Sequence, residues 1–310
     1  MLSIWLSIAP IFGLIILGHA LRRGSIPSTE FWDVVDKLVY WVLLPSLLFY
    51  KMSTAQFDPR LVGSYTVVIL GAFLASVVFA LLSGRIAGFS GPVCSTLLQG
   101  CARHNMFISL AAAERIYGLG GLEIAILAAA LLIPVTNLTM VPLLISLVSG
   151  AATPGRFKAI VNDLVRNPLL LSVGLGIAVG IIWPAEIPVV HDMTRLLGGA
   201  ALPIVLLSVG ASLRLRGLSA SAAPIALAVV GKLAVFPMAA VVLAHLVGLN
   251  EMETVIALLF AAAPTATSSY TLARQLGGDA PLMAAIMTLQ TAAAFVTLPV
   301  TVLLVQLAFQ

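Results

Sequence analysis

Charged side chains are scarce in this sequence. Of its 310 residues only 9% are charged, whereas 61% are hydrophobic and the mean hydropathy is +1.12. A soluble domain carries about a quarter charged residues, so this composition excludes a soluble globular protein and predicts one embedded in lipid. With four Trp and five Tyr there is little aromatic surface for stacking on bases. The net charge of +4 therefore indicates membrane orientation rather than nucleic-acid binding.

Cysteines and catalytic motifs are also few. Cys94 and Cys101 fall on one face of one predicted helix, too far apart to bridge, and we expect two core thiols without a disulfide or metal cluster. No Walker motif, His-Glu-x-x-His motif, pair of mid-span aspartates or Ser–His dyad occurs. The sequence therefore predicts neither an enzyme nor a cofactor. Because no basic residue precedes the first apolar run, we expect that run to be a retained span.

Long apolar runs are abundant instead. About 20 helical residues cross the hydrocarbon core of a bilayer, and ten runs have this length, which predicts an all-α integral membrane protein of ten transmembrane helices. Short connections separate them, and the one that begins at Ala151 predicts a short interfacial helix. The ten predicted spans are 3–21, 33–53, 61–84, 92–117, 121–149, 167–184, 194–213, 222–247, 252–276 and 281–308.

The Lys and Arg residues of the connections predict the orientation. Cytoplasmic loops carry the excess of positive charge, and here the connections after odd-numbered spans hold nine basic residues, against four after even-numbered spans. Both termini are therefore expected on the outer side. The nine are Arg22, Arg23, Arg85, Arg156, Lys158, Arg166, Arg214, Arg216 and Arg274, and the four are Lys51, Arg60, Arg115 and Arg195.

The two halves of the chain carry prolines at a nearly constant offset. Pro45 and Pro203 lie 158 positions apart in the second and seventh spans, and Pro142 and Pro299 lie 157 apart in the fifth and tenth. Five spans is an odd number, so such halves must be inverted in the membrane. We therefore expect one repeat at 1–150 and an inverted one at 151–310.

Two predicted spans are interrupted by residues that a plain membrane helix avoids. Cys101–Phe107 introduces a charge at mid-membrane depth, and Ala263–Tyr270 introduces a proline followed by hydroxyl residues. In lipid such breaks persist only where they line a cavity or a site. Breaks at corresponding places of two halves are typical of the binding site of a secondary transporter. The candidate substrate-binding residues there are Arg103, His104, Asn105, Pro264, Thr265, Thr267, Ser268 and Ser269.

These motifs resemble those of a known family. His104–Gly118 resembles the fourth-helix motif of the auxin efflux carrier family, which includes plant PIN exporters and bacterial carriers of malonate and other carboxylates. Pro264–Asp279 resembles the ninth-helix motif of its bacterial members, and Leu43–Phe49 and Gly231–Pro237 are similar to its second and eighth helices. The plant exporters have proline where this chain has His104.

The resemblance implies the fold of the sodium/bile-acid symporters, with two inverted five-helix repeats in which broken helices four and nine cross. Spans 1, 2, 6 and 7 would form a scaffold, and spans 3–5 and 8–10 a transport unit that moves as an elevator. It also implies a bacterial inner membrane protein, in which the outward termini predicted from the basic residues would be periplasmic.

Arg103 is the strongest candidate for substrate contact. Its guanidinium stays charged and matches a carboxylate with two parallel hydrogen bonds. The alternative is a structural pair with Glu114 or with a carbonyl. For the hydroxyl residues the alternative to substrate contact is bonding to carbonyls one turn back.

Three further polar residues lie within predicted spans. Lys232 has no acidic neighbour in sequence, and it is interpreted as an ion-coupling residue, acting in proton coupling or as a built-in cation at the sodium site of the symporter relatives, with an interfacial lysine as the alternative. Asn137 and Gln290 could reach the crossing as substrate ligands or bond between helices.

The predicted function is secondary active transport of a small organic anion, a malonate-like or auxin-like carboxylate, by alternating access. Proton coupling or uniport is favoured because few acidic residues lie in mid-span. The alternatives are a sodium-coupled symporter, or a channel or sensor on the same fold. The expected partners are the substrate and the lipid bilayer, with no nucleic acid. Gly176 and Gly180 form a Gly-xxx-Gly pattern that would serve either packing within the chain or a homodimer.

Overall fold

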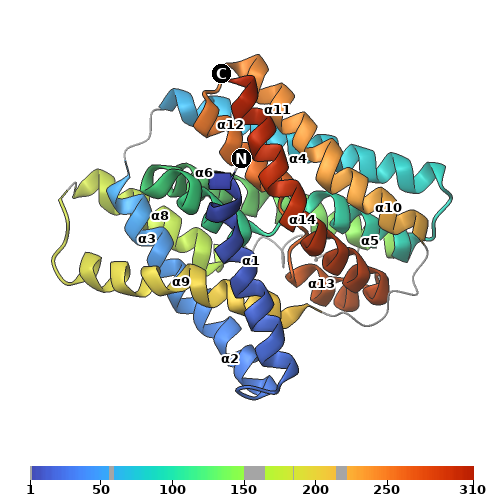
Figure 1. The fold of residues 1–310 in the computed structure, drawn as a ribbon, viewed down its shortest axis with the longest axis horizontal. Helices are drawn as coiled ribbons and strands as arrows, with labels where there is room; N and C mark the ends of the chain where they lie inside the picture. The colour runs from blue at the N-terminus through green and yellow to red at the C-terminus, as the bar shows by residue number, and fades with distance from the viewer. Residues whose placement is uncertain (1, 56–58, 150–164, 184, 214–221) are drawn as a thin grey trace.

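The computed structural model describes residues 2–55, 59–149, 165–183, 185–213 and 222–310, and all regular structure in these ranges is helical (Figure 1). The predicted all-α class is therefore confirmed there. The interfacial helix expected after Ala151 and the 150/151 boundary between the halves lie outside these ranges. The helices, with two π-helical turns labelled η, are α1 (Leu2–Arg23), α2 (Thr29–Leu38), η1 (Val39–Leu43), α3 (Leu44–Thr54), α4 (Pro59–Ile86), α5 (Gly91–Ala102), α6 (Met106–Ser149), α8 (Pro168–Ile182), α9 (Val190–Ser212), α10 (Ala222–Val230), η2 (Gly231–Val235), α11 (Phe236–Val247), α12 (Glu251–Ala262), α13 (Ser268–Leu276) and α14 (Ala280–Ala308).

Six helical stretches of the described residues are long and apolar enough to cross a membrane. They are Ile4–Arg23, Arg60–Ile86, Gly91–Val148, Val190–Ser212, Ala222–Val247 and Ala280–Ala308. Pro168–Ile182 is apolar but shorter, and the predicted second and ninth spans are divided into shorter helices. The protein is therefore a multi-pass membrane protein, whereas the count of ten spans stays a prediction.

The longest helix, α6, contains the predicted fifth span and part of the fourth. Its 44 residues would extend about 66 Å if straight, roughly twice the hydrocarbon thickness. Gly118 interrupts it with φ 65° and ψ −148°, a conformation that L side chains rarely adopt. The chain therefore turns where the sequence predicted a connection between two spans.

Prolines account for the two π-helical turns. η1 precedes Pro45 and η2 precedes Pro237, each proline lying in the first turn of the following helix. Proline lacks the N–H of the helical ladder and its ring presses on the carbonyl four residues back, and a local widening to π geometry relieves both effects.

Glycines allow close packing between helices from the two halves of the sequence. α1 packs along α9 and α3 along α8. A Cβ at Gly18 of α1 would collide with the carbonyl of Leu207, and a Cβ at Gly180 of α8 would lie 2.8 Å from the carbonyl of Ser53. The Gly176–Gly180 pattern is thus used for packing within the chain, the first of the two predicted alternatives.

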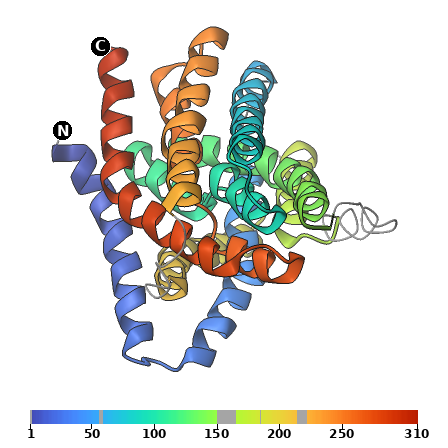
Figure 2. The ribbon, with the colours of Figure 1, turned by 90° about the vertical axis from the view of Figure 1, so that its right-hand side faces the viewer.

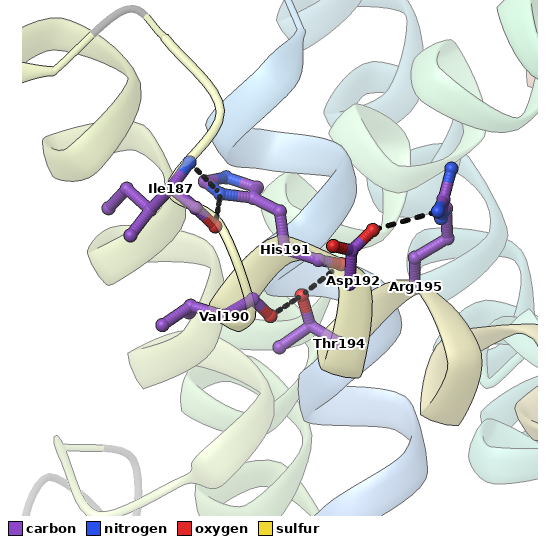
Figure 3. Close-up of polar contacts among 6 residues, drawn as sticks. All are labelled: Ile187, Val190, His191, Asp192, Thr194 and Arg195. Carbon is purple, nitrogen blue, oxygen red and sulfur yellow. Dashed lines mark hydrogen bonds and ion pairs between the residues drawn. The ribbon is translucent and has the colours of Figure 1, made fainter.

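Both ends of the chain lie at one end of the molecule, and the turn between α1 and α2 lies at the other (Figure 2). α9 begins after Val189, where the backbone N–H of Ile187 donates to His191 Nδ1 over 2.7 Å, and Asp192 pairs with Arg195 one turn on (Figure 3). The other ring nitrogen of His191 lies 2.9 Å from the hydroxyl of Ser53, which attaches the start of α9 to α3.

Candidate functional site

The two predicted interruptions are present and lie in direct contact. α5 ends at Ala102 and α6 begins at Met106, while α12 ends at Ala262 and α13 begins at Ser268. The backbone N–H of Asn105 donates to the carbonyl of Pro264 over 2.8 Å. Residues 103–105, the first break, and residues 263–267, the second break, therefore form one crossing of four half-helices.

Gln290 of α14 holds this crossing together. Its Oε1 accepts the backbone N–H of Thr265 at 3.0 Å and lies 2.6 Å from the Thr265 hydroxyl. Its amide nitrogen donates to the carbonyls of Gly100 and Ala228 at 2.9 and 3.0 Å. Gln290 is fully buried, and its two donors and its carbonyl are all engaged with protein. Of the two roles predicted for Gln290, its contacts match a bond between helices.

Asn105 closes the start of α6. Its Oδ1 accepts the backbone N–H groups of Phe107 and Ile108 at 3.1 and 3.4 Å, which is the arrangement of a helix N-cap. The Ser109 hydroxyl donates to the carbonyl of Leu259 at 3.0 Å and ties α6 to α12. The Asn105 amide nitrogen has no hydrogen bond to the described residues, and Asn105 lines the central cavity. One end of this side chain is structural and the other end is free to bind.

The start of α13 is open by comparison. Its N-cap, Thr267, makes no side-chain capping bond, and both Thr267 and Ser268 line the central cavity. Ser269 is fully buried without a hydrogen-bond partner for its hydroxyl among the described residues, and it does not line that cavity. The N-terminal end of a helix carries partial positive charge and free N–H groups, which favour an anion.

Arg103 lies beside this open end. One of its terminal nitrogens donates to the Ser268 hydroxyl at 2.9 Å. Among the described residues no carboxylate lies within ion-pair distance of Arg103, so the pair with Glu114 that we considered is not formed. Its Nε is buried without a partner. A guanidinium has five N–H donors, and most of these remain available to a ligand.

A large cavity reaches the crossing from one end of the molecule. It encloses about 1220 Å³ and is lined at one end by His19, Arg22 and Arg23, close to the α1–α2 turn, and at the other by Arg103. This central cavity is a mixed polar and apolar chamber between helices of both halves of the sequence. Its other polar lining residues are Asp33, Asp36, Tyr40, His104, Asn105, Thr136, Asn137, Asn167, Ser212, Thr267, Ser268, Tyr270, Thr271 and Thr288.

The structure thus separates the candidate residues into two groups. Arg103, His104, Asn105, Asn137, Thr267 and Ser268 line the central cavity, whereas Pro264, Thr265, Ser269, Gln290 and Lys232 do not. Lys232 is fully buried, and its Nζ lies 4.5 Å from the centroid of the Phe236 ring without a hydrogen-bond partner among the described residues. The interfacial alternative for Lys232 does not fit this burial.

The residue pattern did not single out a polar face that runs along α2 into η1. Asp33, Asp36 and Tyr40 line the central cavity, and Asp36 accepts a hydrogen bond from Ser208 of α9. Their spacing of three and four residues places them on one side of a helix. A polar stripe at this spacing inside an apolar span was the signal that could have identified them.

Two comparisons with known proteins also indicate a membrane transporter. Residues 156–302 match the family described as "Membrane transport protein". The chain is also 23% identical over 288 residues to an "Uncharacterized transporter" of Methanothermobacter thermautotrophicus, an alignment that covers 92% of this chain and 93% of the relative. The resemblance drawn from the motifs is therefore confirmed over residues 156–302, which are similar to this family of membrane transport proteins.

Proposed function

We propose that the protein is a secondary carrier that moves a small organic anion, a malonate-like or auxin-like carboxylate, by alternating access. The observation that carries this proposal is the guanidinium of Arg103, which faces a large cavity at the helix crossing without a carboxylate partner among the described residues. A charge at this depth in a membrane protein needs a partner, and a substrate carboxylate supplies one with matching geometry.

The other polar groups around Arg103 support an anionic ligand. Thr267 and Ser268 bring hydroxyl donors and the uncapped start of α13 to the same wall of the cavity. The free amide nitrogen of Asn105 and the ring of His104 lie on the lining as well. In this proposal Thr265, Gln290, Pro264 and Ser269 act as positioning residues, because they hold or fill the crossing without reaching the cavity.

The packing of the helices is compatible with two inverted repeats, 1–150 and 151–310. The predicted first span packs on the seventh and the second on the sixth, as α1 on α9 and α3 on α8. α4 and α11, from the predicted third and eighth spans, also pack on each other. Each contact thus joins equivalent elements reciprocally, as a two-fold relation between the halves requires.

The central cavity lies between the proposed scaffold and the proposed transport unit. α1, α2 and α9 contribute Arg22, Asp36 and Val205, while α6 and α13 contribute Asn137 and Ser268. Its lining includes Arg22 and Arg23 next to the α1–α2 turn, on the side that the basic loops assign to the cytoplasm. We therefore interpret this conformation as inward-open, and an elevator movement of the transport unit would present Arg103 to the other side.

Lys232 is the candidate for ion coupling in this scheme. A proton bound or released by this buried amine would change the charge of the transport unit. Its interaction with the Phe236 ring offers the protonated form a weak cation–π partner. These features support proton coupling or uniport over sodium symport.

The test uses purified protein in proteoliposomes. Arg103→Ala is expected to abolish saturable uptake and counterflow of malonate and indole-3-acetate, since bonds to a charged group are worth about 1.5–3 kcal/mol each and two of them about 100-fold or more in affinity. Arg195→Ala, which removes an exposed arginine remote from the crossing, should transport like wild type. Folded Arg103→Ala protein with wild-type transport would exclude the proposed role of Arg103, and flux without saturation or counterflow would favour a channel.

A further inference from the structure

A second, smaller cavity adjoins Arg103 on the side of α13. This side groove encloses about 220 Å³ between α6 and α13. It shares Arg103, Asn137, Ser268 and Thr271 with the central cavity, so a ligand held by the guanidinium lies at the junction of the two spaces.

The side groove is polar because of the register of two helices. On α13, Ser268, Thr271 and Gln275 recur at intervals of three and four residues and line it together, as residues on one helical face do. Asn137 supplies the opposite wall from α6. Val141 and Leu272 complete the lining as its apolar members.

The polar side chains of the groove lack partners within the protein. Among the described residues, Asn137, Thr271 and Gln275 make no hydrogen bond, whereas Gln290, another amide within an apolar span, makes four. Thr271 and Gln275 are exposed and Asn137 is partly buried, and amide and hydroxyl groups on the wall of a groove favour a polar occupant over an apolar one. Among the described residues that line this groove Arg103 is the only charged one. In the proposed function its guanidinium is paired with the substrate carboxylate, so the remaining lining favours an uncharged polar group.

We propose that the side groove is a subsite for an uncharged polar substituent of the transported anion, a hydroxyl or a carbonyl on a carbon close to the carboxylate. Thr271 follows Ser268 by one turn, about 4.5 Å along the helix axis, which is the distance scale of a substituent one or two carbons from a carboxylate bound at Arg103. Among the acids that the site accepts, hydroxy- and oxo-carboxylates should then bind more tightly than acids without such a substituent. This inference rests on the proposed transport function.

Calorimetric titration of the purified protein in detergent tests the subsite with propionate, lactate, pyruvate and malonate as probes. Lactate and pyruvate are expected to bind about tenfold tighter than propionate, since one or two additional hydrogen bonds contribute about 1–1.5 kcal/mol. In the double variant Asn137→Leu/Thr271→Val the ratio of the propionate Kd to the lactate Kd should fall to about one. Thr301→Val, whose hydroxyl bonds only within α14, should keep the wild-type ratio.

The outcomes separate this inference from the proposed function. Equal affinity for propionate and lactate, or an unchanged ratio in the double variant, would each overturn the subsite. Acid binding that is lost in Arg103→Gln would still support the anion site in those cases. If the wild-type protein binds none of these acids, both the proposed function and the subsite are contradicted.

Discussion

The two breaks of the crossing contain similar residues but use them differently. The first break, residues 103–105, caps the helix that follows it, because the side-chain oxygen of Asn105 accepts N–H groups at the start of α6. The second break, residues 263–267, is held from outside by Gln290 and leaves the start of α13 uncapped. The first break therefore supplies the charge of Arg103 next to a capped helix start, and the second supplies an uncapped helix start beside that charge.

The polar groups of the two breaks therefore fall into two sets, one that stabilises the crossing and one that stays available to a ligand. Gln290 and Thr265 satisfy each other and the freed backbone groups, so that the break can exist in a low-dielectric interior. Arg103, Thr267 and Ser268 keep donors available, which is unfavourable without a ligand and favourable with one. Stability and binding should consequently respond to different substitutions at residues only a few positions apart.

The largest loss of stability is expected for Gln290→Leu. The substitution removes four hydrogen bonds and leaves the N–H of Thr265 buried without a partner, at a cost of about 3 kcal/mol or more. The Tm in detergent should fall by at least about 5 °C. Gln306→Leu on the same helix removes a single bond, to Tyr117, and should cost about 1 kcal/mol. Equal losses in the two variants would contradict the role of Gln290 as the clamp of the crossing.

A smaller loss is expected for Asn105→Ala. Removal of the cap should cost about 1 kcal/mol of unfolding free energy, and removal of the free amide nitrogen should lower transport in proteoliposomes. Asn250→Ala is the matched control, because Asn250 caps α12 through Glu253 at 3.0 Å and does not line the central cavity. It should lose similar stability with wild-type transport. A transport defect in the control equal to that of Asn105→Ala would mean that capping alone explains the effect.

Thr267→Val sharpens the comparison at the second break. Since the Thr267 side chain makes no capping bond, the free energy of unfolding should change by less than about 0.5 kcal/mol. Its hydroxyl faces the central cavity, so anion affinity should fall about threefold to tenfold. Thermal unfolding and calorimetric titration of the same preparation measure the two effects. A destabilisation as large as that of Asn105→Ala would show that α13 depends on this residue as a cap.

Arg195→Ala should have the smallest effect. Its ion pair with Asp192 is 2.8 Å long, but both side chains are more than half exposed at 60% and 62% (Figure 3). Exposed pairs contribute about 0–1 kcal/mol, so the Tm should remain within about 1–2 °C of wild type. A clear loss of transport in this variant would mean that arginines outside the breaks also act on the anion.

The class of fold and the positions of the two helix breaks could be predicted from the sequence because both follow from the cost of polar groups in lipid. Apolar runs predicted membrane helices, and Arg103 and Pro264 marked the places where such helices break. The turn at Gly118 also fell where a connection was expected. The number of spans could not be fixed in the same way, since Pro168–Ile182 is shorter than a full span and several other predicted spans are divided.

The roles of individual polar residues could not be predicted. Asn137 and Gln290 are both amides within apolar spans, and sequence alone gave them the same two interpretations. Packing distinguishes them, because Gln290 meets four backbone and side-chain groups at the crossing while Asn137 faces open space in two cavities. The direction in which a side chain points depends on the elements packed around its helix, and the sequence of that helix alone does not determine it.

The bond between Asn105 and Pro264 also restricts how the protein can change shape. Pulling the two breaks apart would expose backbone groups to a medium that cannot hydrate them, and the Gln290 clamp would have to be broken at the same time. We therefore expect the crossing to travel as an undivided piece, with its anion contacts kept intact. The surfaces that slide should then be those between the crossing and α1, α2 and α9, where the central cavity lies.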